Sequence, residues 1–96
     1  MEMESQDAVN MAAVLNEVAV ERFRQEKKWG RQDHAMPNYL MILGEEVGEA
    51  NKECLEEYFN RSITKKTYKN LREELIQVAA VAVAMVECLD RQNETT

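Results

Sequence analysis

The chain is poor in the residues that interrupt helices or link small proteins covalently. Its 96 residues include one proline, three glycines and two cysteines. So few breakers leave room for long helices. Cys54 and Cys88 each fall on an apolar helical stripe and form no C-x-x-C pair, which predicts two reduced core thiols in a cytoplasmic protein and neither a disulfide nor a zinc site.

Positive charge and long apolar runs are also scarce. The chain has 12 Lys and Arg and 18 Asp and Glu, which gives a net charge of −6. A nucleic-acid polymer needs a basic face, so we expect no such partner, whereas a free nucleotide stays possible if a bound metal supplies positive charge. The longest apolar run, residues 78–86, is too short to span a bilayer, and the polar first six residues do not resemble a signal peptide. We expect a soluble protein without a membrane partner.

Three stretches show apolar residues at spacings of three and four, which is typical of amphipathic helices. The first runs from about Ser5 or Asp7 to Lys28. The second follows Pro37, with Asn38 as its predicted N-cap, and extends to about residue 58. The third begins somewhere between residues 62 and 70 and ends near residue 91. The inner stripe of the second helix is predicted to be Leu40, Leu43, Val47, Ala50, Cys54 and Tyr58.

These stretches predict one all-α domain over residues 1–96, a helical hairpin preceded by an N-terminal helix, with residues 1–5 and 92–96 frayed. The run 78–86 is apolar on every side, and three helices of this length cannot bury such a segment alone. Gly44 and Gly48 lie one turn apart, which favours close approach of a neighbouring helix or a ligand. We therefore expect a homodimer or homotetramer of the four-helix-bundle type.

Two acidic clusters occur on the second and third helices: Glu45-Glu46-x-x-Glu49 and Glu73-Glu74-x-x-Gln77. A spacing of three places side chains on one helix face. If the helices pack side by side, the clusters converge and repel one another unless a cation neutralises them, which suggests a divalent metal and a phosphate substrate. Oxygen donors favour Mg²⁺ or Mn²⁺, and the only histidine lies in a loop, which excludes a di-iron carboxylate bundle.

One consideration weighs against this interpretation, and the helix lengths offer a check on it. Glutamate makes up 15 of the 96 residues, and paired glutamates are more often solvated surface than metal ligands. The clusters also have to lie at one level of the hairpin. A third helix that starts near Thr64 satisfies this condition, whereas a start at Asn70 would separate the clusters by more than a turn.

The segments Gly44–Glu49 and Leu71–Gln77, with Trp29-Gly30-Arg31-Gln32-Asp33-His34 ahead of them, resemble the MazG-like family of all-α nucleoside triphosphate pyrophosphohydrolases. The resemblance covers about residues 22–91. It implies hydrolysis of a nucleoside triphosphate to the monophosphate and pyrophosphate. Gln77 stands where the family has Asp, which removes one negative charge from the site.

The resemblance implies that Glu46, Glu49 and Glu74 hold magnesium, with Gln77 in the fourth position and Glu73 or Glu45 as substitutes. It also places Trp29, Gln32 and His34 near the base or sugar. Glu49 or Glu45 could take the proton from the attacking water. The cations that cluster before Glu73 are candidate phosphate contacts, with a solvated basic flank as the alternative: Lys65, Lys66, Lys69 and Arg72.

The sequence thus leaves three functional hypotheses, in this order. The first is a magnesium-dependent nucleoside triphosphate pyrophosphohydrolase. The second is a non-catalytic helical dimer that binds a nucleotide or a protein after losing the fourth ligand. The third is a purely structural oligomer. Turnover separates the first from the others, because a binder is stabilised by nucleotide without consuming it.

Overall fold

The computed structural model describes residues 2–94, and this part of the chain contains three helices and no strand. The helices are α1 (Ser5–Trp29), α2 (Met36–Tyr58) and α3 (Lys69–Glu94). This confirms the predicted all-α class. The helices include Ser5 and residues 92–94, where fraying was predicted; positions 1 and 95–96 lie outside the described residues. Within residues 2–94, no helix is long and apolar enough to cross a membrane.

Helix boundaries follow local chemistry. Gly30 ends α1 with φ of 75°, a conformation that glycine adopts without strain, and its N–H donates to the Glu26 carbonyl. The predicted N-cap at Asn38 is wrong, because α2 already begins at Met36. Pro37 sits in the first helical turn, where its missing N–H leaves no hydrogen bond unmade. Asn38 is therefore inside the helix, and its N–H donates to the Ala35 carbonyl.

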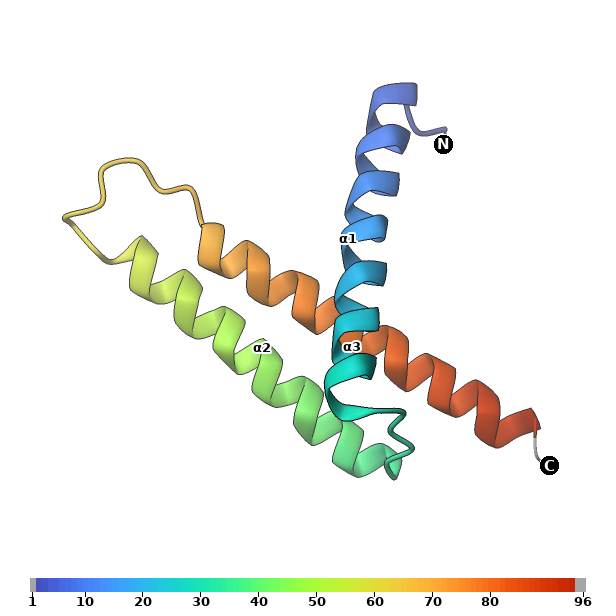
Figure 1. Cartoon of the computed structure of the whole chain (residues 1–96). Helices are drawn as coiled ribbons and strands as arrows, with labels where there is room; N and C mark the ends of the chain where they lie inside the picture. The colour runs from blue at the N-terminus through green and yellow to red at the C-terminus, as the bar shows by residue number, and fades with distance from the viewer. Residues whose placement is uncertain (1, 95–96) are drawn as a thin grey trace.

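Helix α3 is the centre of the structure. Helices α2 and α3 form an antiparallel hairpin, and α1 crosses α3 at an angle (Figure 1). Both α1 and α2 pack against α3 rather than against each other. The small residues of α3 allow this close packing from two sides. The buried core consists of Val18, Tyr39, Ala50, Ala80, Val81 and Cys88.

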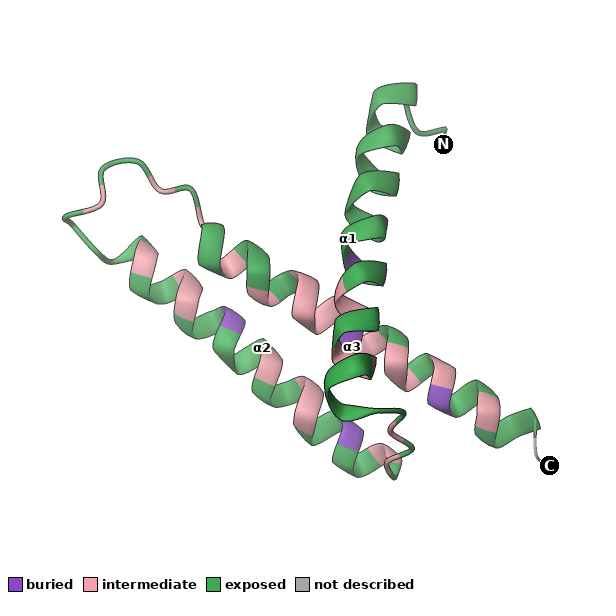
Figure 2. Ribbon diagram, viewed as in Figure 1, coloured by how far each residue is buried: buried purple, intermediate pink, exposed green. Residues whose placement is uncertain are grey.

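This core is small for the surface that surrounds it. The chain exposes 7506 Å² and has a radius of gyration of 16.2 Å. A folded monomer of this mass exposes about 5,700 Å², and a compact chain of this length has a radius of about 12.5 Å. The first half of α1 is exposed on every side (Figure 2). The three helices therefore form an open arrangement.

Helix α2 turns a different face inward from the one predicted. Leu43, Ala50 and Cys54 are half-buried or buried, but Leu40, Val47 and Tyr58 are exposed. A Cβ added to Gly44 or Gly48 would meet nothing within 4 Å, so no group of residues 2–94 uses the space that these glycines leave. The face toward α3 instead includes half-buried carboxylates, Glu46 and Glu53 among them.

The apolar run of α3 is only partly covered. Ala80 and Val81 are buried, whereas Val83 and Val86 remain exposed. The coverage of this run by a second chain stays a prediction.

Candidate functional site

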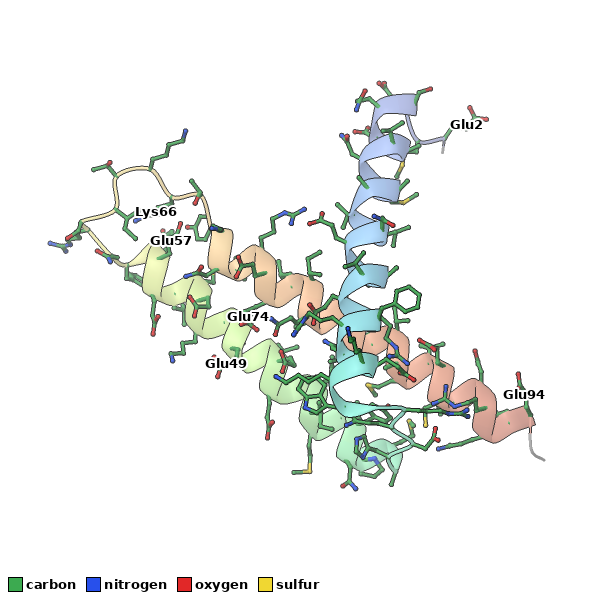
Figure 3. All side chains as sticks on the ribbon, in the orientation of Figure 1. Glu2, Glu49, Glu57, Lys66, Glu74 and Glu94 are labelled. Atoms are coloured by element: carbon green, nitrogen blue, oxygen red, sulfur yellow. The ribbon has the colours of Figure 1, made fainter. Side chains whose placement is uncertain are left out.

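The two acidic clusters lie on the two helices of the α2–α3 hairpin, and they are only partly turned toward each other. Glu46 is half-buried, whereas Glu45, Glu49 and Glu73 are exposed. Glu74 on α3 is half-buried, and its Oε2 is buried without a hydrogen-bond partner. Burial, followed by the charges of Glu46, Glu49 and other carboxylates, raises the pKa of Glu74. Burial and the charge of Glu49 likewise raise the pKa of Glu46. Figure 3 shows Glu74 and Glu49 on the two helices of the hairpin.

The charges of Glu46 and Glu49 reach Glu74 although α3 begins at Lys69, close to the start for which a mismatch was expected. The connection, residues 59–68, folds back along the end of α2. The Lys66 Nζ donates to the carbonyls of Glu57, Asn60 and Ile63. The Tyr68 N–H donates to Glu57 Oε2 at 2.7 Å, so α3 starts beside Glu57. Figure 3 places Glu57 and Lys66 together at this end.

The donor set fits a hard divalent cation. Its atoms are carboxylate oxygens that repel one another, and one of them is buried without a partner. A cation would satisfy this oxygen and offset the repulsion. As the side chains stand, no three His, Cys, Asp or Glu residues within 2–94 form a group that could hold a metal ion. Binding would therefore require the glutamates to turn toward a common point.

A pocket of about 340 Å³ adjoins this cluster. Three residues of the predicted base-binding segment, Trp29, Gln32 and His34, line it together. Glu46 and Gln77 line the same pocket, so the cavity opens onto the acidic cluster. The remaining lining residues are Arg24, Gln25, Tyr39, Ile42 and Val81.

Hydrogen bonds hold the loop that forms one wall of this pocket. The buried Tyr39 donates its hydroxyl to the Gln32 carbonyl at 2.7 Å, and its ring packs edge-on against His34. The His34 Nε2 lies 3.0 Å from Gln32 Oε1. Arg91 of α3 donates to Asp33 of the same loop. Desolvation raises the pKa of Tyr39, so the hydroxyl keeps its proton and remains a donor.

The predicted cations are not in this pocket. Lys65 and Lys69 are exposed and line neither the pocket nor the neighbouring cavity described next. Arg72 donates to both carboxylate oxygens of Glu17 and lines a neighbouring cavity of about 430 Å³ with Glu73 and Gln77. Gln77 thus borders both cavities.

Sequence reasoning missed three residues of the site. Arg24 is the cation that lines the pocket, but in the sequence it resembles the ordinary basic end of a helix. Glu21 is close enough for its charge to raise the pKa of Glu46. Tyr39 carries no motif beyond its place after Pro37-Asn38. The exposed Glu45 also raises the pKa of Glu46, and the exposed Glu73 that of Glu74.

Comparison with known proteins gave no relative. No model of a known protein family matches the chain, and no curated protein or solved structure is significantly similar to it. The functional argument therefore depends on the residues and on their arrangement.

Proposed function

We propose that the chain is a magnesium-dependent nucleoside triphosphate pyrophosphohydrolase of the MazG-like type. One observation carries the proposal. The pocket lined by Trp29, Gln32 and His34 is also lined by Glu46 of the α2 acidic cluster. The charge of Glu46 acts on Glu74 of the α3 cluster, whose Oε2 is buried without a hydrogen-bond partner. An aromatic wall suits a base, and an acidic cluster that lacks a cation suits a metal-bound polyphosphate.

The residues divide the chemistry between them. Trp29 stacks on the base, while Gln32 and His34 offer hydrogen bonds to its edge or to the sugar. Glu46, Glu49 and Glu74 hold Mg²⁺ (or Mn²⁺), with the Gln77 amide oxygen or Glu73 as a further donor. When bound, the ion offsets negative charge on the phosphate oxygens.

A carboxylate takes the proton from the water that attacks the α-phosphorus, and pyrophosphate leaves. Glu49 and Glu45 are the candidates for this base. The charge of Glu49 raises the pKa of both Glu46 and Glu74, whereas Glu45 affects Glu46 alone. Because its charge acts on a carboxylate of each helix, we favour Glu49 as the base.

The test is pyrophosphate release from a panel of ribo- and deoxyribonucleoside triphosphates with Mg²⁺ or Mn²⁺. We expect turnover of at least one nucleotide and its loss in Glu49→Gln, with helical circular dichroism unchanged. Glu56→Gln removes the same charge from an exposed position of α2 outside both cavities and should keep full activity. Full activity in Glu49→Gln would refute the assignment.

A second function is favoured by Gln77. This amide lines the pocket, and the MazG-like resemblance implies that it stands in the fourth ligand position, where it would lower the charge available for a metal. A non-catalytic nucleotide binder would then show a higher melting temperature with nucleotide and no turnover. A purely structural oligomer would respond to neither nucleotide nor metal.

We further propose that the chain assembles as a homodimer or homotetramer. Exposed or half-buried apolar residues repeat along α3 at the alternating spacings of four and three that are typical of a coiled-coil seam. These residues, called the α3 seam below, are Leu75, Ala79, Ala82, Val86 and Leu89. A second copy would cover them. The free thiols of Cys54 and Cys88 support a cytoplasmic location.

A further inference from the structure

Glu21 and Arg24 form an ion pair on α1 at the boundary between the two cavities. The Arg24 Nε donates to Glu21 Oε1 at 2.8 Å, and its Nη2 donates to Oε2 at 2.7 Å. Arg24 lines the pocket that contains Trp29 and also the neighbouring cavity, which Glu21 lines too. Among the residues that line the Trp29 pocket, Arg24 is the one permanent cation.

The two partners differ in exposure. The Glu21 side chain is 14% exposed and the Arg24 side chain 54%. Gln25 adds a hydrogen bond to Glu21 at 3.1 Å, so the carboxylate is held in place while the guanidinium reaches into solvent. The bond from Arg24 lowers the pKa of Glu21, which keeps a negative charge beside the acidic cluster.

We propose that Arg24 breaks its ion pair with Glu21 in order to bind the phosphate groups of the nucleotide. The freed Glu21 carboxylate then strengthens the binding of the divalent cation. This inference rests on the proposed function. The guanidinium already makes two hydrogen bonds to Glu21, and a polyphosphate offers it the same bidentate geometry with a more highly charged partner. The exchange is therefore favourable for Arg24.

The exchange couples two ligands. When Arg24 leaves, the Glu21 carboxylate loses its cation near Glu46, and a divalent ion offsets part of the negative charge there. Anion and cation then each raise the affinity for the other by the same factor. The contribution of Glu21 to cation binding matters more because Gln77 is neutral. Glu21 supplies a negative charge that an Asp at position 77 would otherwise provide.

The test measures binding without catalysis, by calorimetry in EDTA, for a panel of nucleoside triphosphates and the corresponding neutral nucleosides. Arg24→Gln should weaken triphosphate binding by about ten- to a hundredfold and leave nucleoside binding unchanged. Glu21→Gln should tighten metal-free triphosphate binding by roughly threefold, because Arg24 is released. Lys27→Gln removes a charge from an exposed position of α1 outside both cavities and should bind as the wild type does.

A titration with Mg²⁺ completes the design. In the wild type, Mg²⁺ should tighten triphosphate binding more than it does in Glu21→Gln. Unchanged triphosphate affinity in Arg24→Gln, equal loss of nucleoside binding, or weaker metal-free binding in Glu21→Gln would overturn this inference and leave the proposed function standing. If the folded wild type binds no nucleotide of the panel, the proposed function falls, and this inference falls with it.

Discussion

Glu74 has the least favourable surroundings of the carboxylates in the acidic cluster. One of its oxygens is buried without a partner, and the neighbouring charges on α2 are all negative. Desolvation of an ionised carboxylate opposes folding unless a hydrogen bond or a cation compensates for it. At neutral pH and without a metal, this residue therefore destabilises the fold that it belongs to.

The pH dependence of stability follows from the direction of the shift. The pKa of Glu74 is raised above its ordinary value of 4.5, so the unfolded chain loses this proton first as the pH rises. The contribution to stability is complete below pH 4.5 and is lost as the pH rises through the folded-state pKa. Glu74→Gln removes the charge, and we expect the metal-free melting temperature at pH 7 to rise by roughly 4–8 °C, for about 1 kcal/mol.

Thermal melts at pH 4 and pH 7, with EDTA and with Mg²⁺, check this prediction. Mg²⁺ should stabilise the wild type more than Glu74→Gln. Glu56→Gln serves again as the exposed control and should melt as the wild type does. A Glu74→Gln protein that is less stable than the wild type in EDTA would show that Glu74 makes a favourable contact.

At the scale of the helices, the sequence predicted positions along the chain better than directions around it. The approximate spans of α1 and α3 follow from periodicity and from Gly30. The motifs also named Trp29, Gln32 and His34 together with Glu46, and all four residues line one pocket. Periodicity cannot say which neighbour a face meets. Helix α2 has both an apolar and an acidic face, and the surface that packs against α3 includes residues of each. Leu40, on the apolar face, therefore remains exposed.

The level at which the clusters meet depends on the connection between α2 and α3, which has no periodic signal. Lys66 sets its course by donating to three carbonyls, and two of them, from Glu57 and Asn60, lie at the end of α2. No count of helical residues could reveal that Tyr68 would lie beside Glu57.

Lys66 offers a test at this scale. Lys66→Gln removes a charged donor from three carbonyls, and we expect the free energy of unfolding to fall by about 1–2 kcal/mol. Urea denaturation measures this loss, and faster amide exchange near Tyr68 should accompany it. Lys65→Gln, at the exposed neighbouring position, is the matched control. Equal stability of the two variants would mean that the Lys66 bonds do not hold the connection.

At the scale of the whole molecule, the exposed surface exceeds that of a compact monomer by about 1,800 Å². A standard interface buries about 800 Å² on each partner. The excess is thus large enough for more than one interface on each chain. This is the physical reason for proposing either a dimer or a tetramer.

We expect sedimentation at micromolar concentration to give a dimer or larger assembly. Val86 lies in the α3 seam and is 57% exposed in the single chain. Val86→Glu places a charge in the expected interface and should shift the chain toward monomer and lower its melting temperature. Val9→Glu, at a similarly exposed valine near the start of α1, should leave the assembly unchanged. A monomeric wild type would contradict the proposal that the α3 seam is an interface between two copies of the chain.

Trp29, on the wall of the pocket, gives the chain an optical property. It is the single tryptophan of the sequence, its side chain is half in solvent, and the Lys28 ammonium lies 4.8 Å from its ring centre. The emission of an indole depends on the polarity and charge around it, so any occupant that covers the ring or displaces Lys28 alters the fluorescence. Because no other tryptophan contributes, the indole emission of the unlabelled protein reports on the surroundings of Trp29 alone.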